Sequence, residues 1–383
     1  MRIGILTGGG DVAGLNTVIR DVVYRAAREK EKVEVVGIRR GWGCLIYHDP
    51  EKKDMNPEHA MVLDEESVRN IDGEGGTWLR TSRTNPLKVT STPDLKEFRG
   101  FEFEGKRDMS LDAIKNLENW GIDSLIAVGG DDTLSFARYL KKIGFPVMGV
   151  PKTVDGDVAG TDYCIGFATG ISRATDYLTS FRSCLGSHER IGVVEIFGRD
   201  AGFTGLYTAF AAKPDRVVIP EVDFDMDKLV ELLYNDRIKN ERRYSLVLAS
   251  EGAKQKGSEV VYEGKEFDQF NHKKLGGIGK IIESHIKKKL GVETMSERIA
   301  YRIRSGIPDA KDRIFASIFA NIVFDSITRG NFGMMAAIKN GKPCLVPLED
   351  TENSPKKVDV ERFYNSERYR PNYKNLRGSL LLL

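Results

Sequence analysis

The stretch MRIGILTGGGDVAGLNTVIRDVV (residues 1–23) places three consecutive glycines between a short apolar run and a helical pattern. Aliphatic residues dominate positions 2–6 and predict a strand. From Leu15 to Ala27, apolar residues recur every three or four positions and predict a helix with one apolar face. A second apolar run, Val33–Ile38, completes a strand, helix, strand unit. The glycines therefore occupy the turn from a strand into a helix.

A glycine turn at this place lets a ligand approach the backbone, and the helix N-terminus offers free N–H groups to an anion such as phosphate. Gly8, Gly10 and Ala13 also match the loose dinucleotide fingerprint. The second strand ends in Arg39 and Arg40, without the acidic residue that holds an NAD ribose, so NADP is the only nicotinamide cofactor that remains open. Taken alone, the turn fits a phosphate loop and a tight turn without a ligand equally well.

The whole chain alternates β-branched runs with segments of helical period, which predicts an α/β fold with mostly parallel sheets. Its 383 residues suffice for two domains. The predicted strands are Arg2–Leu6, Val33–Ile38, Ser124–Val128, Val147–Val150, Gly192–Phe197, Arg216–Ile219 and Ser245–Ala249. Two polar stretches, Asp49–Asn56 and Lys254–Lys274, are expected to be surface loops.

Charge and cysteine content narrow the class of partner. With 58 Lys and Arg against 56 Asp and Glu, the net charge of +2 does not point to nucleic acid or an acidic membrane. The four cysteines are scattered without metal-like spacing, which suits a reduced cytoplasm. No stretch approaches the roughly 18 apolar residues of a membrane span, and the N-terminal apolar run is too short for a signal peptide. We therefore expect a cytoplasmic protein with no nucleic-acid or membrane partner.

Two further turns after predicted strands carry carboxylates. SLIAVGGDDTLSFARYL (124–140) places Asp131 and Asp132 where a strand meets a helix, and adjacent carboxylates suit Mg²⁺ that also binds substrate phosphates. Simple capping of the helix is the alternative. GVPKTVDGDVAGTDYCIGF (149–167) gathers Lys152, Asp155 and Asp157, a cation for phosphate beside a carboxylate that can accept a proton. Here the alternative is a solvated turn.

Six motifs in one order resemble the phosphofructokinase superfamily, whose members phosphorylate fructose 6-phosphate with ATP or pyrophosphate. The motifs are TGGGDVAGLN, GGDDT, PKTVDGD, SHERIGVVEIFGRDAG, IPE and SEGA, and the similarity runs from Arg2 to about Pro347. The resemblance implies two Rossmann-like domains facing across a cleft. The larger, donor-binding domain would comprise 1–166 plus about 303–347, the smaller, sugar-phosphate-binding domain 167–302, and residues 348–383 would form a C-terminal extension.

The resemblance also assigns roles on the donor side. Gly9 and Gly10 are similar to the loop that holds the donor phosphates, and Arg83 in WLRTSRTNP to the arginine between the two phosphate sites. Asp131 resembles the Mg²⁺-associated carboxylate. Asp155 resembles the base that takes the proton from the sugar 1-hydroxyl, with Asp157 in support and Thr153 near the transferred phosphoryl group.

On the sugar side, the family pattern implies substrate contacts from the Phe197-Gly198-Arg199 segment and from Glu251. Arg190, Tyr301 and Arg304 resemble the clamp on the 6-phosphate, and Arg298 is a further candidate for a phosphate ligand. In this family one of the clamp arginines usually comes from a neighbouring subunit. The resemblance therefore implies a homodimer or homotetramer with shared active sites.

Two positions bear on the donor. Asp132 stands where ATP users of the family generally have glycine, and its carboxylate would crowd and repel a nucleotide's α-phosphate. Lys152 stands where many bacterial ATP users have glycine, and its ammonium is suited to pyrophosphate. The pair resembles the pyrophosphate-dependent branch, with the ATP-dependent branch as the alternative.

Two other positions depart from the family pattern near the sugar. Gly156 replaces an asparagine and Phe197 replaces a methionine, which leaves another sugar phosphate, such as sedoheptulose 7-phosphate, open. A sensor without turnover would have lost the base or metal carboxylate, yet Asp131, Asp155 and Asp157 are all present. An NADP-binding oxidoreductase leaves Asp131, Lys152 and the set of arginines unexplained. The enzyme interpretation is therefore favoured.

Overall fold

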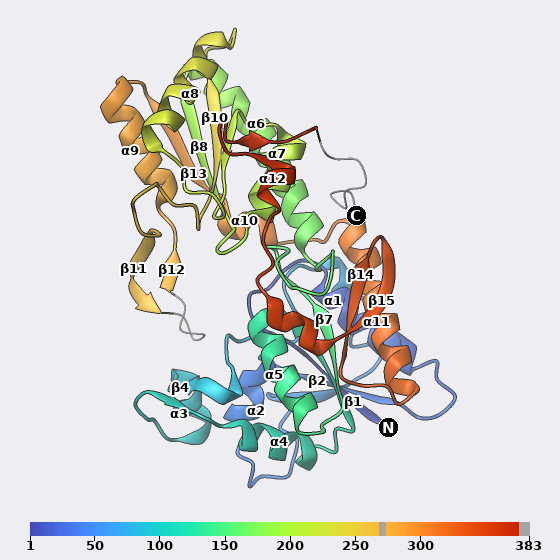
Figure 1. Cartoon of the computed structure of the whole chain (residues 1–383). Coiled ribbons are helices and arrows are strands. Elements are labelled where there is room, and N and C mark those ends of the chain that lie inside the picture. Colours follow the sequence, from blue (N-terminus) through green and yellow to red (C-terminus); the bar gives the residue numbers. More distant parts are fainter. Residues whose placement is uncertain (268–272, 375–383) are drawn as a thin grey trace.

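A computed structural model describes residues 1–267 and 273–374 of the chain. Two sheets dominate it, a larger one and a smaller one, each with helices packed on its faces (Figure 1). Within the described residues, no helix combines the length and the apolar character that crossing a membrane requires.

The larger sheet has seven strands, and the five central ones are parallel. An antiparallel strand closes each edge. In order across the sheet, the strands are β15 (Lys342–Pro347), β14 (Met334–Lys339), β7 (Val147–Pro151), β6 (Ser124–Gly129), β1 (Arg2–Thr7), β2 (Glu34–Ile38) and β3 (Ala60–Leu63).

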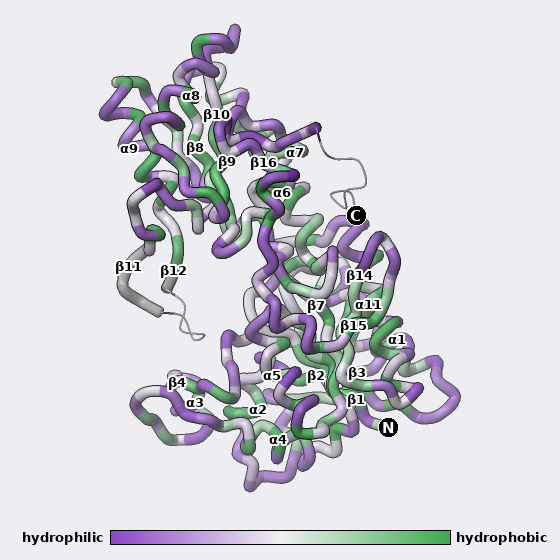
Figure 2. Tube along the Cα trace, viewed as in Figure 1, coloured by the Kyte–Doolittle hydropathy of each residue, from purple (hydrophilic) through white to green (hydrophobic). Residues whose placement is uncertain are grey.

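The core of this sheet lies where helices cover strands that are apolar on both faces. Ile3, Ile5 and Leu6 of β1 are fully buried, as parallel strands between two helical layers require. Figure 2 shows hydrophobic residues gathered along the strands and hydrophilic residues on the outer loops. The covering helices are α1 (Leu15–Ala26), α4 (Ser110–Asn119), α5 (Asp131–Lys142) and α11 (Ala310–Thr328).

The smaller sheet has four strands, all parallel. Their order is β13 (Thr294–Arg298), β8 (Ile191–Ile196), β10 (Ser245–Ser250) and β9 (Arg216–Val218). The helices around it are α6 (Phe167–His188), α7 (Phe203–Ala212), α8 (Met226–Lys239), α9 (Ile278–Leu290) and α10 (Ala300–Arg304). A hairpin of β11 (Tyr262–Phe267) and β12 (Lys273–Leu275) extends from the smaller sheet (Figure 1).

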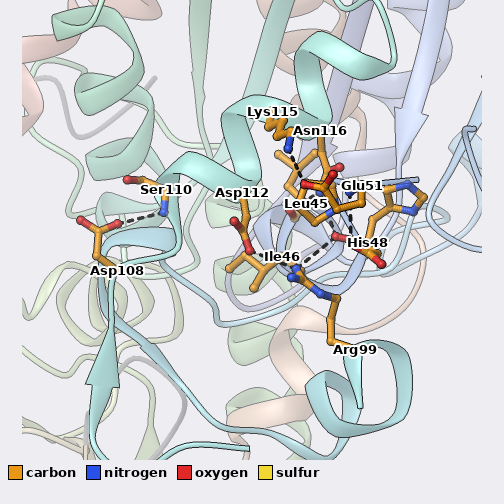
Figure 3. Close-up of polar contacts among 12 residues, drawn as sticks. Leu45, Ile46, His48, Glu51, Arg99, Asp108, Ser110, Asp112, Lys115 and Asn116 are labelled. Carbon is orange, nitrogen blue, oxygen red and sulfur yellow. Dashed lines mark hydrogen bonds and ion pairs between the residues drawn. The ribbon is translucent and has the colours of Figure 1, made fainter. Parts of the chain in front are cut away.

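Hydrogen bonds fix a group of short helices beside the larger sheet (Figure 3). In α4, the Asn116 amide donates to the carbonyl oxygens of Leu45 and His48, at 2.9 Å in both cases. Arg99 donates to the Ile46 carbonyl and pairs with Asp112, each at 3.0 Å. These bonds satisfy the free carbonyl groups at the end of a short helix. The elements are α2 (Cys44–Tyr47) and α3 (Pro93–Arg99), with the short hairpin β4 (Val89–Thr90) and β5 (Lys106–Arg107) nearby.

The chain after the larger sheet returns to the smaller one. Beyond a 3₁₀ helix (Leu348–Asn353) come α12 (Val360–Phe363), β16 (Tyr364–Asn365) and β17 (Arg370–Pro371). The Tyr364 hydroxyl donates to the Val217 carbonyl at 2.7 Å, and the Val217 N–H donates to the Tyr369 carbonyl at 2.8 Å. The extension is therefore part of the fold as far as residue 374, and residues 375–383 lie outside the described residues.

The α/β class is confirmed, and each of the seven predicted strands is present with boundaries that differ by at most one residue. The prediction of a loop over Lys254–Lys274 is wrong, because β11 and part of β12 fall within it. The loop at Asp49–Asn56 is confirmed. All strands of the larger sheet fall within 2–151 and 334–347, and those of the smaller sheet within 191–298. The division into a donor domain and a sugar domain stays a prediction.

Candidate active site

A cavity of about 370 Å³ collects residues from the carboxyl ends of strands in both sheets. This is where open α/β sheets bind ligands. From the larger sheet and its loops, the predicted residues that line it are Gly9, Gly10, Arg83, Asp131, Asp132, Lys152, Thr153, Asp155 and Asp157. From the smaller sheet and the helix after β13, they are Phe197, Arg199, Glu251 and Arg304.

Close packing explains the glycine turn after β1. Gly9 has a left-handed φ of +78°, and a Cβ on Gly8 would lie 2.5 Å from Thr133 Oγ1. The carbonyl of Gly10 accepts a hydrogen bond of 2.7 Å from Lys152 Nζ, so the lysine ammonium sits directly on the turn. The turn thus joins bare backbone to a cation, a combination suited to phosphate.

Burial changes the pKa of Lys152, which is only 3% exposed. Burial, followed by the positive charge of Arg304, lowers the pKa of the ammonium to about 8, while Asp11 opposes that change. An anion bound at this turn would therefore stabilise the charged form of Lys152 and offset part of the cost of burying the ammonium.

Asp131 and Asp132 are the first two residues of α5, and both line the cavity. The N-cap of α5 is Gly130, so neither carboxylate acts as the N-cap of this helix. Asp131 Oδ1 lies 3.6 Å from Nη1 of Arg138, and its side chain is half exposed. Both carboxylates remain at the cavity wall beside the glycine turn.

The oxygen atoms of these two carboxylates are chemically suited to Mg²⁺. Carboxylate oxygens are hard ligands, and Mg²⁺ usually binds one or two of them while phosphate and water complete its shell. Within the described residues, no group of three or more His, Cys, Asp or Glu could enclose a metal ion. Asp131, the carboxylate predicted to be associated with Mg²⁺, lies at the wall of this cavity.

The loop after β7 holds the candidate base. Its geometry is set by Thr153, whose hydroxyl accepts the backbone N–H of Asp155 at 3.1 Å. Asp155 Oδ1 is buried, and no hydrogen-bond partner within the described residues reaches it. Burial, and then the negative charges of Asp157 and Glu251, hold the pKa of Asp155 well above its usual range. Burial also raises the pKa of Asp157. A carboxylate in this setting is a strong proton acceptor with an open lone pair.

Gly156 in this loop has a structural explanation. Its φ is +67°, and a Cβ there would lie 2.9 Å from two ring carbons of Phe167. The departure from asparagine therefore follows from packing against the first residue of α6.

The smaller sheet contributes a carboxylate and aromatic rings. Glu251 follows β10 directly and is 8% exposed. Burial raises its pKa to about 7, although Arg298 and Arg199 oppose that rise. The rings of Phe197 and Tyr301 meet edge to face at 6.1 Å between centroids.

Arg304 crosses from these rings to the glycine turn. Its guanidinium lies 4.8 Å from the Tyr301 ring centroid and 5.6 Å from that of Phe197. Its Nη2 atom is 3.0 Å from Oδ1 of Asp11. One cation thus contacts both sides of the cavity.

Three predicted residues do not line the cavity. Arg190 precedes β8, whereas Phe197 follows that strand, so the two lie at opposite ends of it. Its guanidinium is 3.9 Å from Glu293. Gly198, with φ +134°, lies in the tight turn after β8, where its carbonyl accepts the Gly252 N–H at 3.0 Å. Tyr301 is 61% exposed and stands at the rim beside Phe197.

Sequence patterns missed other residues of the wall. Asp11, Asp200 and Pro355 line the cavity without having been singled out. The position of Asp11 directly after the glycines was a usable signal, whereas Pro355 belongs to the C-terminal extension and carried none. Arg298, a further candidate for a phosphate ligand, instead pairs with two carboxylates, Glu195 and Glu251.

Comparisons with known proteins agree with this architecture. The family model described as Phosphofructokinase matches residues 2–327. A pyrophosphate--fructose 6-phosphate 1-phosphotransferase of Thermoproteus tenax is 37% identical over 91% of this chain and 93% of its own length. The ATP-dependent 6-phosphofructokinase 3 of Streptomyces coelicolor is 35% identical over 96% of this chain and 99% of its own.

Among solved structures, a pyrophosphate-dependent phosphofructokinase from Marinobacter aquaeolei aligns with a TM-score of 0.76 at 17% identity. The alignment covers 99% of this chain and 90% of that one. At this identity the likeness establishes the fold alone, whereas the sequence relatives carry both donor names.

Proposed function

The chain belongs to the phosphofructokinase family, and from this premise we propose that it transfers a phosphoryl group from pyrophosphate to the 1-hydroxyl of fructose 6-phosphate. The products are fructose 1,6-bisphosphate and inorganic phosphate. Because the free-energy change of this transfer from pyrophosphate is expected to be small, the reaction should run in both directions. The observation that carries the proposal is that one cavity is lined by Asp132, Lys152 and Asp155, with the Lys152 ammonium hydrogen-bonded to the glycine turn.

In the proposed reaction, Asp155 accepts the proton of the 1-hydroxyl while the oxygen bonds to the terminal phosphorus of pyrophosphate. The bridging P–O bond breaks, and inorganic phosphate leaves with the bonding electron pair. The raised pKa of Asp155 suits it to hold that proton. Lys152 and Arg83 bind donor oxygens, so that charge neutralisation and positioning account for most of the rate.

Asp131 is the residue we propose to hold Mg²⁺ together with donor oxygens. When bound, the ion supplies charge neutralisation on the phosphates. The sugar phosphate would lie against Arg199 and Glu251 with Phe197 beside it, and the Arg304 guanidinium would reach the 6-phosphate. A planar guanidinium can bind two phosphate oxygens at once.

Asp132 supports pyrophosphate over ATP. Its carboxylate lines the donor side at the first turn of α5, where an additional nucleotide phosphate would meet negative charge. Pyrophosphate carries no such additional phosphate, and the glycine turn with Lys152 offers it an anion site. The name of the Thermoproteus tenax relative agrees with this donor.

ATP is the second candidate donor, and one structural observation favours it. A neighbouring cavity of about 240 Å³ shares Gly9, Gly10, Arg83 and Arg304 with the main one and extends to Tyr47 and Arg40. An aromatic ring and an arginine beside a phosphate loop suit a nucleoside. The name of the Streptomyces coelicolor relative agrees with this donor.

The test is formation of fructose 1,6-bisphosphate by the purified protein with fructose 6-phosphate and Mg²⁺, with pyrophosphate and ATP in parallel assays. We expect turnover with pyrophosphate. Turnover with ATP alone would contradict the donor assignment and leave the sugar assignment intact. Silence with both donors, followed by activity with sedoheptulose 7-phosphate, would contradict the sugar assignment.

A further inference from the structure

Three charged side chains meet at the carboxyl ends of neighbouring strands in the smaller sheet. Arg298 ends β13 and lies directly opposite Glu195 of β8, while Glu251 follows the adjacent strand β10. Arg298 Nε is 3.2 Å from Glu195 Oε1, and Arg298 Nη2 is 3.2 Å from Glu251 Oε2. One guanidinium therefore bridges two carboxylates, of which only Glu251 lines the sugar side of the cavity.

Both carboxylates are buried, at 3% exposure for Glu195 and 8% for Glu251. A buried charge requires a partner and further hydrogen bonds, so removal of Arg298 would leave two buried carboxylates without their shared cation. Glu195 also accepts the backbone N–H of Gly277 at 3.0 Å and that of Gly279 at 2.9 Å. These N–H groups open α9, so the bridge ties the Glu251 side of the cavity to the start of that helix.

The guanidinium of Arg298 packs closely against Gly276. A Cβ on Gly276 would lie 2.7–2.8 Å from three atoms of the Arg298 guanidinium, and Gly276 has a φ of +143°. Arg298 Nη2 also donates to the Leu275 carbonyl at 2.8 Å. The glycine pair at 276–277, which lies outside the family motifs quoted above, is therefore shaped to hold this side chain.

We propose that Arg298 is a positioning residue for the sugar-phosphate site, whose guanidinium keeps the Glu251 carboxylate charged and oriented toward the bound sugar. This inference rests on the proposed function for the identity of the sugar. Arg298 itself does not line the cavity, so it acts through Glu251.

The charges around Glu251 predict the sign of the effect. Arg298 and Arg199 favour its ionised form, while burial and the carboxylates of Glu195 and Asp155 disfavour it. Burial wins and raises the pKa of Glu251 to about 7. Loss of Arg298 removes the largest opposing influence, so the pKa of Glu251 will rise further and the group will become neutral at physiological pH.

The decisive measurement is the titration of the Glu251 carboxyl band by infrared difference spectroscopy, assigned by its loss in Glu251→Gln. In the wild-type protein we expect the midpoint near pH 7. In Arg298→Met it should lie about one pH unit or more higher. Calorimetric binding of fructose 6-phosphate without a donor should weaken by about fivefold or more at pH 7 and recover toward pH 9.

Two further variants keep the inference testable if Arg298→Met does not fold. Gly276→Ala leaves the arginine in place but pushes its guanidinium off the backbone, and should move the midpoint in the same direction. Arg216→Met is the matched control. Arg216 is a buried arginine of β9 that pairs with Asp236 at 2.6 Å, away from the cavity lining. It should lose stability without any shift in the Glu251 midpoint.

An unchanged midpoint in Arg298→Met, or in Gly276→Ala where the first variant does not fold, would overturn the inference. An equal shift in Arg216→Met would overturn it as well, because the effect would then report general loosening of the sheet. Failure of the wild-type protein to bind fructose 6-phosphate would contradict the proposed substrate, and the infrared titration would still decide the role of Arg298.

Discussion

Asp155 occupies the position with the clearest chemical consequence among single residues. Substitution by asparagine preserves the shape of the side chain but removes its capacity to take a proton. We expect Asp155→Asn to lower turnover by about 10²–10⁴-fold, while calorimetry should detect fructose 6-phosphate binding close to that of the wild type. Asp162→Asn, in the same loop but outside the cavity lining, is the control. Turnover near the wild-type rate in Asp155→Asn would rule out this residue as the base.

The donor choice is testable at Asp132 and Lys152. Asp132→Gly removes a negative charge from the donor side of the cavity, and adding Lys152→Gly removes the cation suited to pyrophosphate. We expect the double variant to raise kcat/KM for ATP relative to pyrophosphate by at least about tenfold. The reason is that a contact between two charges about 4 Å apart contributes on the order of 1–4 kcal/mol near a protein surface. The kcat/KM ratio of the two donors is the measurement, and an unaltered ratio would place donor selectivity elsewhere.

The pKa of Lys152 predicts an alkaline limit to donor use. A lysine with a pKa near 8 is charged below that pH and loses its charge above it, so pyrophosphate binding should weaken as the pH rises through 8. The KM for pyrophosphate is the measurement. In Lys152→Arg, the guanidinium stays charged, so the rise in KM should move to higher pH. The wild-type protein and Lys152→Arg use the same donor, so the titration of pyrophosphate itself affects both KM profiles equally. If the KM for pyrophosphate rises at the same pH in both proteins, Lys152 is not the titrating group.

At the residue scale, the sequence predicted those site residues that stand directly after buried strands. Asp131, Asp155 and Arg199 belong to such turns, and their arrival at one cavity follows from the common edge of parallel strands. The sequence did not predict contacts between residues that lie far apart in the chain. Asp11 meets Arg304 across most of the chain, and Arg298 finds its carboxylates only because β13 lies beside β8.

At the scale of elements, the start of α6 is joined to the start of α11 by one buried carboxylate. Asp312 accepts hydrogen bonds from the Tyr163 hydroxyl (2.6 Å), the Gly166 N–H (2.7 Å) and both the N–H and the hydroxyl of Thr169 (2.8 and 2.6 Å). These donors flank the first turn of α6, directly after the loop that carries Asp155. Asp312 thus anchors the helix that follows the base loop.

Asp312→Ala should therefore be costly, because it leaves four donors without their acceptor in the core. We expect a loss of at least about 3 kcal/mol in the free energy of unfolding, measured by urea denaturation. The control is Asp309→Ala, which removes the N-cap of α11 and should cost about 1 kcal/mol. An equal loss in the two variants would show that the buried network contributes no more than an ordinary cap.

The strands that sequence patterns missed have physical reasons of their own. β13 reads TMSER, and a strand at the edge of its sheet can carry polar residues that a central strand cannot. β14 reads MMAAIK, in which alanine and methionine give little β-propensity, so its place depends on pairing with β7 and β15. The polar hairpin of β11 and β12 gave no alternation strong enough to predict.

At the scale of the whole molecule, the C-terminal extension links the base loop to the smaller sheet. The Lys356 N–H donates to the Asp157 carbonyl at 2.9 Å, and its ammonium donates to the Thr161 carbonyl at 2.7 Å. Further along, Tyr364 is bonded to β9. Figure 1 shows this segment running from the larger sheet back to the smaller one. A stretch that offered no motif therefore braces the loop on which the proposed base stands.

The last prediction concerns assembly, which we infer from the family pattern and from Arg190. This arginine lies at the far end of β8 from the cavity lined by its own chain, so a role in phosphate binding requires a neighbouring subunit. Arg190→Ala should then raise the KM for fructose 6-phosphate by about tenfold or more, as expected for the loss of a charge-assisted contact, with little change in the KM for pyrophosphate.

Complementation tests where that arginine acts. In a mixed oligomer of Asp155→Asn and Arg190→Ala chains, a cavity of the Arg190→Ala chain keeps its own Asp155 and receives Arg190 from its Asp155→Asn neighbour. We therefore expect co-expressed, co-purified mixed oligomers to regain a wild-type KM for fructose 6-phosphate at a fraction of the sites. Each variant alone provides the control. If the mixture behaves as the sum of its separate parts, Arg190 does not serve a neighbouring site, and its ion pair with Glu293 is the whole of its role.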